Sequence, residues 1–173
     1  MFYDFRSDPI LGPAHEYWRS KCGARAMPRR RDIDPTEIPH LLPNILIVEI
    51  IGTRIRYRLV GTAIVKAYGE ELTGKYIDEI LSDERLRFAE NNYRIMCGQK
   101  RPVLICNRYH SKRDAPLICT RLVMPLSENG ETVNQCLSAL SFHFPGEADE
   151  WTGQWFGNSD NFDCARSYAK AID

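Results

Sequence analysis

The sequence lacks several features that would assign it to a common functional class. Its 23 basic and 23 acidic residues cancel, whereas proteins that coat nucleic acid or anionic membranes usually carry a basic excess. The longest apolar runs, such as Ile45 to Val48, are far too short to span a bilayer. The first residues include acids where a signal peptide would be basic and then apolar. We therefore expect a cytoplasmic protein with no membrane span and no nucleic-acid partner.

Motifs for catalysis and metal binding are also missing. The six cysteines form no CxxC pair and the four histidines lie far apart, so we expect reduced thiols and no metal site. No P-loop, Gly-x-Gly-x-x-Gly, Gly-x-Ser-x-Gly or His-Glu-x-x-His pattern occurs. We assign no catalytic residue, and the sequence leaves any cofactor unknown.

The composition is that of one globular domain. The chain has 173 residues, of which 43% are hydrophobic and 27% charged, within the usual range for a folded domain. We divide it into an N-terminal helix with a Pro/Arg-rich linker (1–43), a core (44–145) and an acidic tail (146–173). Residues 17–31 hold six basic residues and no acid, while residues 146–173 hold six acids and two bases.

Hydrophobic periodicity and turn residues predict an α+β fold. Helices are expected over Pro13 to Arg25, Gly61 to Gly69 and Ser82 to Cys97. Strands are expected over 44–51, 54–60, 102–110, 116–126 and 132–143, with a tight hairpin at Asn129-Gly130. Strand pairs on either side of a helical middle predict one antiparallel sheet with helices on one face.

Four sequence segments together resemble the bacterial stand-alone PAS-like domains. The segments are Tyr17-Trp18-Arg19; Pro28-x-Arg30-x-Asp32-Ile33-Asp34-Pro35; Leu41-Leu42-Pro43-Asn44-Ile45; and Arg56 to Thr62 with Gly69 and Leu72-Thr73-Gly74. The resemblance covers roughly residues 10 to 143. It implies a sensory module with a five-stranded antiparallel sheet in the order 2-1-5-4-3 and a ligand cavity under the helices. PAS domains bind haem, flavin, small acids or nothing. The flavin photochemical motif Asn-Cys-Arg-Phe-Leu-Gln is absent, and no histidine lies between Thr62 and Gly98, which disfavours both flavin photochemistry and haem.

Arginine clusters are the candidates for binding a small anionic ligand, because guanidinium groups grip carboxylate and phosphate with two parallel hydrogen bonds. The first is Arg29-Arg30-Arg31, for which a solvated loop or internal pairing with an aspartate is the alternative. The second is the arginine face of the second strand, which is either an anion-binding wall or a solvent face. The candidate ligand-binding residues are Arg30, Arg56, Tyr57, Arg58, Asn107, Tyr109 and Arg121; which of the sheet residues reach a cavity depends on strand register.

The apolar face of the first helix offers a candidate interface. Leu11, Trp18 and Cys22 either form the seam of a homodimer or pack on the chain's own sheet. The leading hypothesis is a non-enzymatic PAS-like regulatory module that binds a small ligand and signals to a regulatory protein partner. The alternatives are a small α+β cavity enzyme and an adaptor that has no ligand.

Overall fold

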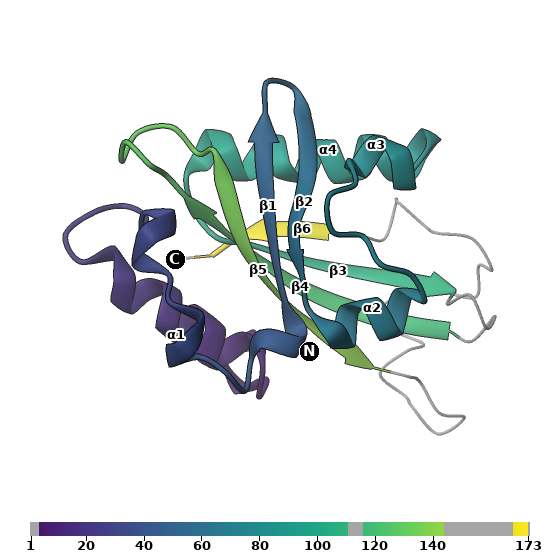
Figure 1. Cartoon of the computed structure of the whole chain (residues 1–173), viewed down its shortest axis with the longest axis horizontal. Coiled ribbons are helices and arrows are strands. Elements are labelled where there is room, and N and C mark those ends of the chain that lie inside the picture. The colour runs from purple at the N-terminus through teal and green to yellow at the C-terminus, as the bar shows by residue number, and fades with distance from the viewer. Residues whose placement is uncertain (1–3, 111–115, 144–167, 173) are drawn as a thin grey trace.

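One antiparallel sheet organises the molecule. The computed structural model describes residues 4–110, 116–143 and 168–172. The strands are β1 (Ile45–Ile51), β2 (Arg54–Val60), β3 (Val103–His110), β4 (Pro116–Leu126), β5 (Gln135–His143) and β6 (Tyr168–Ala171). They pair in the order β2-β1-β5-β4-β3-β6 (Figure 1). The predicted five-stranded order 2-1-5-4-3 is confirmed, and β6 extends it by pairing with Val103 to Cys106 of β3.

The helices fall where a PAS-like arrangement puts them. The N-terminal helix α1 (Leu11–Cys22) precedes the sheet, and α2 (Thr62–Tyr68), α3 (Ile77–Ile80) and α4 (Asp83–Gln99) connect β2 to β3. Short 3₁₀ helices at Arg30–Asp32, Pro35–Glu37 and Leu42–Asn44 shape the proline-rich linker between α1 and β1. Pro35 stands in the first turn of its 3₁₀ helix, where its missing N–H leaves no hydrogen bond unmade.

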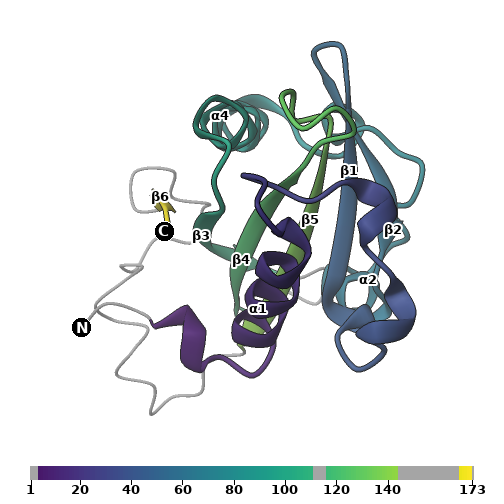
Figure 2. The same ribbon diagram turned by 90° about the vertical axis from the view of Figure 1, so that its left-hand side faces the viewer.

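Both faces of the central strands are covered. Successive residues Leu122 and Val123 on β4 are each almost fully buried, although neighbouring strand residues point to opposite faces. The α4 helix covers one face, where Met96 reaches the Cys136 thiol of β5 with the two sulfurs 4.0 Å apart. The α1 helix packs against β4 and β5 from the other side (Figure 2). The helices between β2 and β3 therefore enclose one face of the sheet, and α1 seals the other.

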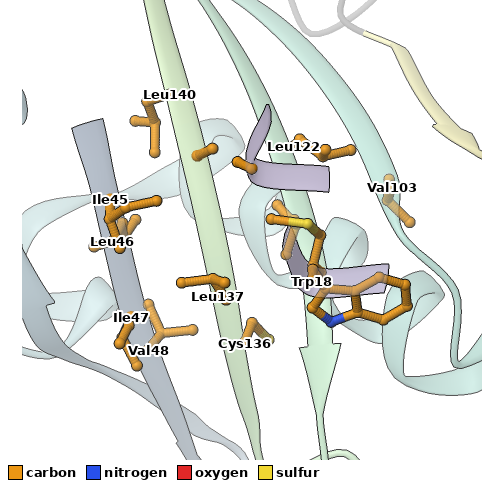
Figure 3. Close-up of a cluster of buried hydrophobic side chains, with 14 of the residues drawn as sticks. Trp18, Ile45, Leu46, Ile47, Val48, Val103, Leu122, Cys136, Leu137 and Leu140 are labelled. Carbon is orange, nitrogen blue, oxygen red and sulfur yellow. The ribbon is translucent and has the colours of Figure 1, made fainter. Parts of the chain in front are cut away.

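The N-terminal segment is tied to the sheet at several points. The Trp18 indole Nε1–H donates to the carbonyl oxygen of Pro125 at 2.9 Å, and Asn44 Nδ2 donates to the carbonyl oxygen of Leu140 at 2.8 Å. Leu11, Trp18 and Cys22 are all buried within the single chain, and Figure 3 shows Trp18 in the apolar cluster with side chains of the sheet. Of the two arrangements left open by the sequence, α1 thus adopts packing on its own sheet. A homodimer built on Trp18 would require α1 to leave the sheet.

Several predicted boundaries were wrong for local reasons. The first helix begins at Leu11 and ends at Cys22, because Gly23 takes a positive φ of 58°. The last helix continues through Gly98 and ends at Gln99, with Lys100 in the left-handed conformation. The tight hairpin predicted at Asn129-Gly130 is a longer connection in which the Asn129 carboxamide oxygen accepts hydrogen bonds from the backbone of Glu131 and Thr132.

Close backbone approach demands glycine at the end of β2. Gly61 donates its N–H to the carbonyl oxygen of Ile45 at 2.8 Å. A Cβ at this position would lie only 2.3 Å from the carbonyl oxygen of Pro43. The Leu42–Asn44 turn can therefore cross the β2–α2 junction only because residue 61 has no side chain.

Candidate functional site

A small cavity lies between the sheet and the helices that connect β2 to β3. We call it the helical cavity. It is lined by Tyr57, Tyr68, Ile77, Ile80, Leu81, Arg85, Phe88, Ala89, Asn107 and Arg121. Its volume is about 30 Å³, enough for roughly one to three water molecules. Its lining is mainly apolar and aromatic, with a few polar groups that converge on the same space.

Strand register brings the polar groups of the sheet together. Asn107 is paired with Cys119 and Ile105 with Arg121, so Asn107 and Arg121 lie on one face of neighbouring strands. Tyr57 reaches the cavity from β2, which lies on the far side of β1 and β5 from β4 in the strand order. All three side chains are buried, and Arg121 is only 8% exposed. Three of the seven candidate ligand-binding residues therefore line one cavity.

The helices supply the rest of the wall. Tyr68 comes from α2, Ile77 and Ile80 from α3, and Arg85 and Phe88 from α4. Beneath α4, the Arg121 guanidinium carbon lies 5.7 Å from the ring centroid of Tyr93, which is within the range of a cation–π contact. The cavity is thus lined by two guanidinium groups, an amide and two phenols, and by no carboxylate among the described residues.

The other predicted site residues lie elsewhere. Arg56 Nη2 binds Glu49 Oε2 at 2.6 Å and Arg58 Nε lies 3.5 Å from Glu49 Oε1, so both arginines are paired with an acid on the adjacent strand β1. Arg30 Nη1 donates to the carbonyl oxygen of Ile33 at 3.1 Å. None of these three lines the cavity. The side chain of Tyr109 lies outside the described residues.

A family model described as a PAS domain matches residues 9–141, well over half of the chain. The chain belongs to the PAS domain family. The search of curated proteins found no match to this sequence.

Solved structures with the PAS and light-oxygen-voltage (LOV) fold resemble this PAS domain at low identity. A LOV domain studied with a flavin analogue has a TM-score of 0.51 at 9% identity, and the match covers 69% of this chain and 87% of that one. The Rhodobacter sphaeroides LOV protein has a TM-score of 0.48 at 12% identity, and the match covers 63% of this chain and 65% of that one. The PAS domain of the HTR-like protein from Haloarcula marismortui gives 0.42 at 12%, covering 62% and 96%. The match thus spans about two thirds of the Rhodobacter protein, and likeness at these identities shows the fold alone.

An arginine on β2 binds α3, the short helix that covers the helical cavity. Arg54 donates to both carboxylate oxygens of Asp78, at 2.8 and 2.7 Å, and its guanidinium carbon lies 3.7 Å from the ring centroid of Tyr76. Asp78 belongs to α3, whose Ile77 and Ile80 line the cavity. The same hydrogen bonds lower the pKa of Asp78. The position of α3 over the cavity is therefore coupled to an exposed contact on the sheet edge.

Burial makes the described thiols of the PAS domain poor nucleophiles, because it raises their pKa values. Burial raises the pKa of Cys106 to about 11 and that of Cys119 to about 12, and it also raises the pKa of Cys136 well above its ordinary value. The five described cysteines are free thiols, and none lines the cavity. Within the described residues there is no group of three or more potential metal ligands, and no helix there is long and apolar enough to cross a membrane.

Proposed function

We propose that this PAS domain is a non-enzymatic sensory module whose helical cavity binds a small monocarboxylate or a comparable anion. The supporting observation is the buried Arg121 guanidinium, which lines a largely apolar cavity together with Arg85 and Asn107 and with no carboxylate among the described lining residues. A guanidinium fork in a low-dielectric site favours a planar anion. The amide of Asn107 and the hydroxyl of Tyr57 supply further hydrogen-bond donors.

The size of the cavity links binding to movement. A volume of about 30 Å³ accommodates a ligand of only a few heavy atoms, of the formate or acetate class, because drug-sized pockets are on the order of 300–1,000 Å³. A larger anion fits only if α3 or α4 moves away from the sheet. The position of α3 or α4 would therefore depend on whether a ligand is bound and on its size. A partner protein would recognise one of these positions.

The relay would pass through the Arg54 contact. Since Arg54 joins β2 to Asp78 of α3, displacement of α3 breaks two charged hydrogen bonds and changes the surface at the β2 edge. This edge is where we place the regulatory protein partner. The domain would act in the cytoplasm, where the free thiols of the described cysteines stay reduced.

The chemistry of the lining supports binding over catalysis. A general base or nucleophile at neutral pH is usually a histidine, a carboxylate, a cysteine or an activated hydroxyl. The described lining residues offer only arginine, asparagine and tyrosine as polar groups. This composition supports the ligand-binding hypothesis over a cavity enzyme.

Calorimetry with small anions tests the proposal. Formate, acetate, propionate and succinate are titrated into the wild type, Arg121→Met, Arg121→Lys and the control Arg87→Met, which alters an exposed arginine of α4 that does not line the cavity. We expect saturable binding of a monocarboxylate by the wild type and by the control. A charge-assisted contact is worth about 1.5–3 kcal/mol, so Arg121→Met should weaken binding by roughly ten- to a hundredfold. Circular dichroism verifies that each variant is folded. The proposal fails if the wild type binds none of the four anions, or if the folded Arg121 variants bind as well as the wild type.

An adaptor without a ligand is the second candidate, and the small volume of the cavity favours it. In an adaptor, the cavity would hold only water and the helices would keep one position. Hydrogen exchange of α3 separates the two functions: the sensor predicts a changed exchange rate of the Ile77 to Ile80 amides when propionate is added, and the adaptor predicts no change with any of the four anions.

A further inference from the structure

A second hollow lies where the end of α1 meets the turn between α4 and β3. Its volume is about 470 Å³, within the range of small-molecule sites. We call it the basic groove. It is lined by His15, Trp18, Arg19, Cys22, Gly23, Arg25, Ala26, Lys100, Arg101, Pro102 and Ile172. Figure 1 shows α1 and the C-terminal end of the chain at the same side of the molecule.

Positive charge dominates this groove. Arg19 and Arg25 come from the α1 end, and Lys100 and Arg101 come from the turn before β3. No acidic side chain lines the groove in the described part of the chain. Arg25 is held in place because its Nη2 binds Asp32 Oδ2 at 2.7 Å and its Nε donates to the carbonyl oxygen of Cys22 at 3.2 Å. The cations therefore approach the hollow from two elements that are distant in sequence.

The backbone at Lys100 is a second, independent observation. Lys100 ends α4 with a φ of 54°, and its N–H donates to the carbonyl oxygen of Met96 at 2.8 Å. Glycine is the preferred residue in this left-handed position, because any side chain there is disfavoured. Lys100 therefore occupies a position that glycine would fill with less strain. Its side chain lines the groove, where the ammonium group can bind an anion.

The remaining lining can hold an uncharged ring. Trp18, Cys22, Ala26, Pro102 and Ile172 contribute carbon and sulfur surface beside the four cations. We propose that the basic groove binds a phosphorylated small molecule of nucleotide size, with its phosphates between the α1 arginines and the Lys100-Arg101 turn. Such a ligand bridges α1 to the end of α4. It would act on the opposite side of the sheet from the face that α2 to α4 enclose, and its binding does not depend on the helical cavity.

Titration of ADP, pyrophosphate and adenosine at about 50 mM salt tests the proposal, because screening of exposed charges is moderate under that condition. The proteins are the full-length wild type, Lys100→Gly, Arg19→Ala and the control Arg87→Ala. We expect ADP to bind the wild type and the control with equal affinity. Adenosine, which has no phosphate, should give no heat of binding. Lys100→Gly should raise the melting temperature and still weaken ADP binding about tenfold or more. If Lys100 had only a structural role, a substitution that raises the melting temperature would not also weaken ADP binding.

Three results would overturn the proposal. The first is no binding of ADP to the wild type. The second is equal ADP affinity in the wild type, Lys100→Gly and Arg19→Ala. The third is pyrophosphate binding that Arg87→Ala weakens as much as Lys100→Gly does, which would mean that anions adsorb to the surface in general. If a single-stranded oligonucleotide binds and ADP does not, the ligand of the basic groove is a nucleic acid and the small-molecule proposal is wrong.

Discussion

Substitution of Trp18 tests the position of α1 in the core. The indole is 5% exposed, and its Nε1–H donates to the Pro125 carbonyl oxygen at 2.9 Å. Trp18→Phe retains an aromatic ring but leaves this carbonyl without its donor, which should destabilise the fold by about 1–3 kcal/mol. Trp18→Ala also removes the ring, and large-to-small core substitutions of this kind cost about 3–5 kcal/mol.

The assay is urea unfolding followed by tryptophan fluorescence and circular dichroism, with light scattering of the native protein. For a chain of this size, a loss of 1 kcal/mol lowers the melting temperature by about 2–4 °C, so Trp18→Ala should melt roughly 6–20 °C lower. We expect the oligomeric state of Trp18→Phe to match that of the wild type. A variant that changes oligomeric state while its free energy of unfolding stays the same would refute core packing of α1 and restore the homodimer seam.

Three further predictions concern the fold and its titratable groups. Gly61→Ala should severely destabilise the protein in thermal melts, because its Cβ would meet the Pro43 carbonyl oxygen. Gly98→Ala, which meets no atom within 4 Å in α4, should instead stabilise it by up to about 1 kcal/mol; equal effects of the two substitutions would contradict the close approach. Burial lowers the pKa of His15 below 6.5, so the unfolded chain binds a proton that the folded chain resists, and stability should fall as the pH drops below about 6.5. His15→Gln should lose that part of the pH dependence in urea titrations, and an unchanged profile would contradict it. Because the pKa of Cys119 is raised to about 12, iodoacetamide at pH 8 should label this thiol only after unfolding, as peptide mass spectrometry can show; rapid labelling of the native protein would count against its burial.

The sheet could be predicted because its strands carry strong local signals. The β-branched run of β1 and the alternating pattern of β2 are joined by Gly52, which takes the positive φ of 61° that the turn requires. The β6 strand was missed because Tyr168–Ala171 is four residues long and contains two alanines, which are uncommon in strands. Its place depends on pairing with β3, which no local pattern reveals.

The candidate site was predicted only in part. Tyr57, Asn107 and Arg121 lie on sheet strands, so alternation places each on one of two faces. Arg85 and Phe88 were missed because α3 and α4 cross the sheet at an angle set by tertiary packing, which helical periodicity does not give. The pairing of Arg56 and Arg58 with Glu49 depends on the register of β1 against β2. The irregularity between Ile47 and Val48 shifts that register, and the sequence alone did not indicate it.

Nuclear magnetic resonance can test whether Arg121 binds a small anion inside the helical cavity. The most direct measurement follows the ¹H–¹⁵N signals of the arginine Nε–H groups during titration with acetate and propionate. We expect a saturable shift of the Arg121 signal, while the Arg56 signal stays in place because its Nε donates to Glu49. An Arg121 signal that does not move, or that moves linearly together with the signals of exposed arginines, would contradict it.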